Sequence, residues 1–209
     1  MVLSKYSMDT FIAPRLSELT KVIVPDLHSC TKEYGNWVNI FILNTIVRIR
    51  IIKRDRQLIM YFLRKVEGAF QEYHEGRFFL ESYVKSRNKA ISSYFHSLRH
   101  FEAAMSLAYH AFDTIRIMNQ GKKLFTKEDG SPLQRLNYLQ NLSKHPDKGL
   151  SQSDISSELN ISIWLTNEGI ECHSTKLLFS EFSSLLIKLA KSAEVISNPP
   201  LSSQKKNIT

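Results

Sequence analysis

The chain has 209 residues, of which 43% are hydrophobic and 23% are charged, and its formal net charge is +8. These proportions are ordinary for a globular protein and exclude a fibrous repeat or a wholly disordered chain. Seven glycines and six prolines are too few for an all-β fold built on tight turns, and the positive charge favours an anionic partner.

The N-terminal quarter predicts short helical pieces. Helical periodicity between Asp9 and His28 is broken by two prolines, since proline interrupts a helix. The most apolar window, Trp37 to Ile52, contains arginine and asparagine and is shorter than the roughly 20 apolar residues of a membrane span. We therefore expect a buried core helix there and no membrane partner. No signal-peptide core precedes it, and the two cysteines lack metal-ligand or redox spacing, so we expect a cytoplasmic location.

Residues 32–118 contain three glycines and no proline and predict two to four helical segments. Two series of apolar residues recur at spacings of three and four, which predicts two long helices packed side by side at a shallow angle. Gly76 interrupts the first series, so a bend, a close helix crossing or a helix break is expected there. The two series are Ile59, Phe62, Val66, Ala69, Tyr73, Leu80 and Tyr83, then Tyr94, Leu98, Phe101, Met105, Ala108, Phe112 and Ile115.

The C-terminal half predicts a loop over 119–130, a helix from Pro132 to Lys144 with Ser131 as its N-cap, and a last helix over 175–196. Between these helices, residues 161–172 alternate around a turn like a small hairpin. The predicted fold is all-α: an elongated antiparallel helical bundle with a small irregular or hairpin insertion near 150–174. It forms a single domain over 1–197, followed by a disordered polar tail over 198–209.

The positive charge is concentrated in one part of the chain. Residues 48–100 carry twelve basic and five acidic side chains, a net +7. On one helix, a 100° step per residue places five of the basic side chains and Tyr61 within one arc of about 120°. Such a ridge could neutralise phosphates while the tyrosine stacks on a base; the alternative is an ordinary solvated helix face. The basic side chains are Arg50, Lys53, Arg54, Arg64 and Lys65.

No nucleophile elbow, phosphate-binding glycine loop or zinc-protease motif occurs in the sequence. His96 and His100 have a spacing that suits a metal ion, but only the distant His110 could supply a third ligand. We therefore interpret them as ordinary polar residues and expect no metal and no cofactor. The helix over 132–144 carries four residues suited to RNA cleavage, in which a histidine acts as acid or base and cations offset phosphate charge. The alternative is that they cap the helix. They are Arg135, Asn141, Lys144 and His145.

The helix that ends in Gln140-Asn-Leu-Ser-Lys-His145, between long helices and a closing helix, resembles the HEPN-type helical domains of bacterial ribonuclease toxins and antiphage systems. The resemblance covers about residues 50–197. Asn141 and His145 match the family motif, but Gln140 stands where active members carry arginine. The resemblance implies a homodimer of a defence or toxin–antitoxin system that binds RNA and cleaves it without a metal. The alternative is a non-catalytic helical subunit that holds a protein partner in a larger complex.

Overall fold

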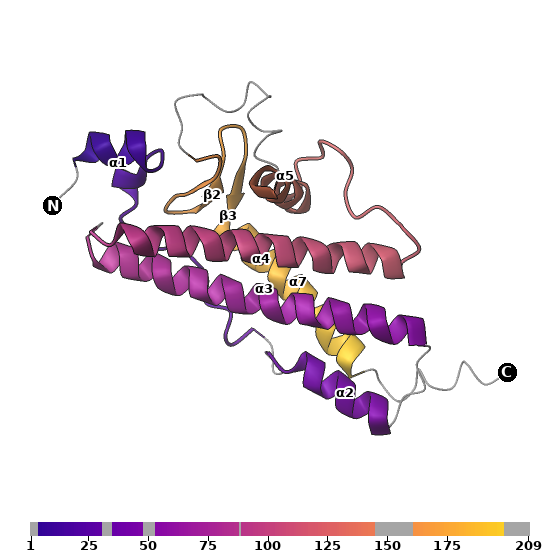
Figure 1. The fold of residues 1–209 in the computed structure, drawn as a ribbon. Coiled ribbons are helices and arrows are strands. Elements are labelled where there is room, and N and C mark those ends of the chain that lie inside the picture. The colour runs from indigo at the N-terminus through magenta and orange to yellow at the C-terminus, as the bar shows by residue number, and fades with distance from the viewer. Residues whose placement is uncertain (1–3, 31–34, 48–52, 88, 145–160, 199–209) are drawn as a thin grey trace.

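The computed structural model describes residues 4–30, 35–47, 53–87, 89–144 and 161–198. Helices dominate this part of the chain, as predicted, and one small sheet accompanies them (Figure 1). The predicted tail lies outside the described residues from 199 on. The helices are α1 (Lys5–Phe11), a 3-10 turn (Leu16–Glu18), α2 (Trp37–Val47), α3 (Lys53–Lys85), α4 (Ile91–Met118), α5 (Pro132–Lys144) and α7 (Phe179–Ser197).

The two longest helices, α3 and α4, lie antiparallel along most of their length and make the most extensive contact in the fold (Figure 1). Both predicted apolar series face the interior, and most of their members are fully buried. Helix α3 continues through Gly76, where a Cβ atom would lie 3.1 Å from the ring of Phe101. The Ser97 hydroxyl donates a 2.7 Å hydrogen bond to the Gly76 carbonyl. Of the three expectations for Gly76, the close helix crossing is therefore confirmed.

The predicted hairpin is present and belongs to a three-stranded antiparallel sheet of order β1-β2-β3. Its strands are β1 (Trp164–Leu165), β2 (Gly169–Glu171) and β3 (Lys176–Leu178). The sequence analysis missed β3, which it placed in the last helix. The Glu181 carboxylate accepts a hydrogen bond from the Leu178 N–H at 3.1 Å, and α7 begins at the next residue. This cap divides the strand from the helix.

Helix α7 crosses the α3–α4 pair and closes the core (Figure 1). Its inner face carries apolar residues at spacings of three and four, of which four are buried and Ile196 is partly buried against the core. The four are Phe182, Leu185, Leu189 and Ala193.

The hairpin turn holds the N-terminal segment, although the two are about 150 residues apart in sequence. Asn167 Oδ1 accepts the N–H groups of Thr20 at 3.0 Å and Lys21 at 2.9 Å. Its Nδ2 donates to the Glu18 carbonyl at 2.9 Å. These three bonds satisfy backbone groups that no sheet or helix would otherwise satisfy. One asparagine side chain thus fastens the segment to the sheet.

The expectation of a buried core helix over residues 37–52 is wrong for α2. Trp37 and Phe41 are buried, but Leu43 is 62% and Ile46 is 77% exposed. Helix α2 packs against α3 and α7 on one side alone, so the apolar residues that circle it cannot all reach the core. Residues 48–52 lie outside the described part. Among the helices that the structure describes, none is long and apolar enough to cross a membrane.

Candidate nucleic-acid-binding site

Helix α5 begins as predicted, because the Ser131 hydroxyl accepts the N–H of Gln134 at 3.2 Å. This N-cap satisfies a backbone N–H of the first turn and fixes where the helix that carries the predicted catalytic residues begins. Asn141 is exposed, and its amide donates to Asn137 Oδ1 at 3.1 Å. Lys144 is the exposed last residue of α5. Asn141 and Lys144 therefore lie on the outer side of this helix.

Arg135 faces another way. Its guanidinium pairs with Glu181 Oε1 at 2.5 Å and donates to the Lys176 carbonyl at 3.2 Å. Both partners belong to the β3–α7 junction, so the pair joins α5 to the sheet and the closing helix. Arg135 is thus held in a structural contact and does not share the side of α5 that carries Asn141. His145, the predicted acid or base, lies outside the described residues.

Gln140 occupies the place that arginine takes in the family motif, and its side chain points inward. It is 4% exposed, whereas the adjacent Asn141 is exposed. The two polar groups therefore do not face one common surface. A substrate that contacts Asn141 would not reach the Gln140 amide.

A cleft of about 430 Å³ lies between the C-terminal half of α4, the connector 119–131 and α5. Asn141 forms part of its wall. Most of the lining residues are of the kinds that bind single-stranded RNA, and Leu124, Leu133 and Asp113 complete the wall. These kinds are amides that read base edges, rings that stack on bases and cations that neutralise phosphates. The amides are Gln134, Asn137 and Asn141; the rings are Tyr109, Phe112, Phe125 and Tyr138; the cations are Arg116, Lys123 and Lys127.

The one carboxylate in the cleft wall is already paired. Asp113 Oδ1 accepts from Arg116 Nε at 2.8 Å, three residues along the same helix. This hydrogen bond raises the pKa of the Arg116 guanidinium. The pair is nearly neutral as a unit, so Asp113 adds little repulsion toward a phosphate. Lys123 and Lys127, both exposed, add positive charge at the outer wall, which the ion pair of Lys127 with Glu128 at 3.4 Å partly offsets.

His110 connects the predicted ridge on α3 with the end of α5. Burial lowers the pKa of its imidazole, and the positive charges of Lys65 and Lys144 lower it further. Lys65 on α3 and Lys144 on α5 are thus both close enough to this ring on α4 to act on its charge. We call Lys65, His110, Lys144 and the cleft beside them the basic face.

The rest of the predicted ridge is only partly described. Arg50 lies outside the described residues, and Lys53 and Arg54 form the start of α3 but their side chains are not described. Tyr61 is 43% exposed, and the Lys65 ammonium lies 5.1 Å from the centre of its ring. That distance is typical of a cation–π contact.

Tyr61 and Arg64 also line a groove of about 460 Å³ between α3 and α2. The α2 wall of this groove is formed by apolar side chains, among them Ile42 and Ile46. The residues of the predicted ridge therefore do not all face the same part of the surface. Lys65 belongs to the basic face, while Tyr61 and Arg64 line the apolar groove.

The histidines with metal-like spacing on α4 have other contacts. His96 and His100 both stack on Phe79, with ring centres 5.0 and 5.4 Å away. His100 Nδ1 also lies 2.6 Å from a carboxylate oxygen of Glu72. These contacts link α3 and α4.

Sequence reasoning identified Asn141 through the motif, Lys144 as a cation near the end of the helix and Lys65 through the charge pattern. It missed Asn137, Tyr109 and the connector lysines, whose common surface depends on how the connector folds back. No protein-family model, curated protein or solved structure matches this chain.

Proposed function

We propose that this protein binds single-stranded RNA on the basic face, and that the chemistry predicted for His145 would act there. The cleft carries the proposal: its wall combines amides, aromatic rings and cations, and the charges of Lys65 and Lys144 act on His110 of the neighbouring helix. An unstacked base fits a cleft of this lining, and the two ammonium groups would contact the phosphates on either side.

Single-stranded RNA accounts for the lining better than a duplex does. A duplex hides its base faces and offers mainly phosphates and sugars, so the aromatic and amide side chains in the cleft would have no partner. The proposal therefore predicts that affinity depends both on charge and on Asn141.

Binding is tested by fluorescence anisotropy with a labelled single-stranded RNA at several salt concentrations. For single strands, each phosphate contact contributes about 0.7 to the slope of log affinity against log salt. The double variant Lys65→Gln/Lys144→Gln should therefore lower this slope by about 1.4. The matched control is Lys188→Gln/Lys191→Gln, which removes two exposed lysines of α7 and should leave the slope unchanged.

Asn141→Ala separates base contact from charge. It should weaken binding of the single strand while the salt slope stays as in the natural protein, because no charge is lost. Equal affinity for single strand and duplex, or equal losses in the two lysine pairs, would contradict the proposal. Circular dichroism of each variant shows whether its fold is retained.

Cleavage is a separate step and is tested separately. Without the family arginine, general acid–base catalysis would rest on His145, with Lys144 offsetting the phosphate charge. The expected result is RNA cleavage that persists in the presence of a chelator and is lost in His145→Ala, while that variant still binds RNA. Binding without cleavage would limit the function to RNA binding.

A second candidate function, a helical interaction subunit, is favoured by the exposed apolar side of α2. Leu43 and Ile46 are largely exposed there beside the apolar groove, and such patches often mark protein contacts. We take a second copy of this chain as the expected occupant, since the resemblance implies a homodimer. Light scattering should then give twice the mass of one chain, and Ile46→Glu should restore the monomer; a monomeric natural protein would exclude a second copy as the occupant.

A further inference from the structure

The segment that follows the 3-10 turn runs across α3 and is held there by side chains of that helix. The Tyr73 hydroxyl donates to the Pro25 carbonyl at 3.0 Å, and Arg77 Nε donates to the Val24 carbonyl at 3.1 Å. Leu27 is buried beneath the segment. Its neighbours Asp26 and His28 are both exposed, so the packing of Leu27 turns these two side chains to the outer side.

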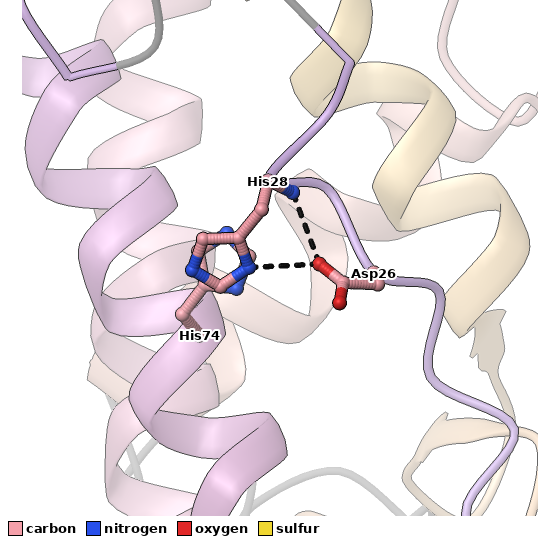
Figure 2. A group of neighbouring side chains, drawn as sticks. All are labelled: Asp26, His28 and His74. Carbon is pink, nitrogen blue, oxygen red and sulfur yellow. Dashed lines mark hydrogen bonds and ion pairs between the residues drawn. The ribbon is translucent and has the colours of Figure 1, made fainter.

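His74 of α3 lies below these two residues. Figure 2 shows the three side chains turned towards one another, with the two imidazoles overlapping in this view. The ring centres of His28 and His74 are 3.8 Å apart. One ligand atom from each of Asp26, His28 and His74 lies within 4.8 Å of the other two. Two imidazole nitrogens and one carboxylate oxygen thus converge from two elements of the fold.

We propose that Asp26, His28 and His74 bind a divalent transition metal ion of the zinc class and that this ion fastens residues 24–28 to α3. Imidazole and carboxylate ligands together suit zinc, cobalt and nickel, whereas magnesium and calcium prefer oxygen ligands throughout. Three protein ligands leave a fourth position for water, as in many zinc sites. None of these residues belongs to the basic face, so the proposal is independent of RNA binding.

The ligand atoms need little movement to reach coordination geometry. Bonds of about 2.0–2.2 Å in a tetrahedron place ligand atoms about 3.4 Å apart. The His28 Nδ1 and Asp26 Oδ1 atoms are 2.8 Å apart, and their side chains are 61% and 55% exposed. Exposed side chains can turn without disturbing a core, so both can adjust around an ion. The less exposed His74 supplies the fixed position.

The neighbouring Arg77 orients the carboxylate. Its Nη1 lies 3.6 Å from Asp26 Oδ2, and its Nη2 lies 3.0 Å from Glu81 Oε1. Glu81 offsets part of the guanidinium charge that would oppose a cation. Arg77 also faces Oδ2, which leaves Oδ1 directed at His28. Metal ligands commonly have such an outer partner that fixes their direction.

The test is calorimetric titration of the chelator-treated full chain with zinc chloride, alongside thermal unfolding with zinc or magnesium. One equivalent of zinc should bind and raise the melting temperature, and magnesium should do neither. His74→Ala and His28→Ala should each weaken zinc binding at least about tenfold, a typical loss for disturbing a metal site. The matched control His173→Ala removes an exposed histidine of the β2–β3 turn and should bind like the natural protein.

Two results would overturn the proposal. One is no zinc binding by the natural chain at micromolar concentrations. The other is binding that survives in His28→Ala and His74→Ala but is lost in Cys30→Ser, which would assign the ion to the thiol. Cobalt absorption offers an independent readout, because the visible bands of a tetrahedral site should appear in the natural protein and be absent from His28→Ala. Because His28 is exposed, this variant should keep its fold.

Discussion

Replacing Asn167 by alanine tests how the N-terminal segment is attached to the sheet. The substitution removes two bonds accepted from the backbone N–H groups of Thr20 and Lys21 and one bond donated to the Glu18 carbonyl. Because Asn167 makes these contacts at an exposed turn, the fold should survive. Asn167→Ala should therefore weaken only the attachment of the N-terminal segment to the sheet.

The magnitude follows from the three bonds. Each intramolecular hydrogen bond contributes about 0.5–1.5 kcal/mol net. Water can replace part of each bond at this exposed site, so the loss should lie in the lower half of the range for three bonds. We therefore expect the free energy of unfolding to fall by about 2 kcal/mol. For a chain of this size that loss corresponds to a decrease of roughly 4–8 °C in melting temperature.

Urea unfolding followed by circular dichroism measures the loss, and amide hydrogen exchange locates it. In Asn167→Ala the amides of Thr20 and Lys21 should exchange faster, while those in the middle of α3 should change much less. Asn167→Asp is the matched control: it keeps both accepted bonds but loses the donor, so these two amides should stay protected. Unchanged exchange at Thr20 and Lys21 in Asn167→Ala would refute the reasoning.

Two further predictions concern glycine and a half-buried carboxylate. A Cβ atom on Gly169 would lie 2.3 Å from the Leu177 carbonyl oxygen, so Gly169→Ala should lower the melting temperature. In the control Gly68→Ala the new Cβ meets only the flexible Leu107 side chain. This control should leave the stability unchanged or raise it by up to about 1 kcal/mol. Burial raises the pKa of Glu102, so the folded state binds a proton more readily and stability from this group falls as pH rises above about 4.5. Urea unfolding should therefore show Glu102→Gln gaining stability over the natural protein from pH 4 to pH 7; a difference that does not change with pH would contradict this assignment.

The helical part of the fold could be predicted because its signals are local. Spacings of three and four recur over many turns of α3 and α4, and Asn167-Glu168-Gly169 marks a turn between two alternating runs. Strand β3 was missed because Leu178 continues the apolar spacing of α7 towards its N-terminus. The exposure of Ile46 was missed for another reason: apolar composition favours burial only where a neighbour is present to cover the residue.

The surfaces depend on contacts that sequence spacing does not encode. Asp26 and His28 are two residues apart and would attract notice as a pair, but His74 follows 46 residues later, on a helix that the segment happens to cross. Likewise, the sequence grouped Asn141 with Arg135 on one helix but did not show that the two face different sides of α5. The opposite wall of the cleft comes from a connector with no periodic pattern.

The attachment of the first thirty residues also has a consequence for the order in which the chain folds. Arg15 pairs with Glu171 across 156 positions, and Asn167 binds Thr20 across 147. At ribosomal rates of about 5–20 residues per second, the N-terminal segment waits roughly 7–30 s for its partners to be made. During that time the segment, whose Leu16 is fully buried in the finished protein, lacks its bonds to the sheet. This segment is thus made early and attached late, and the nascent chain exposes it to chaperones and proteases in the interval.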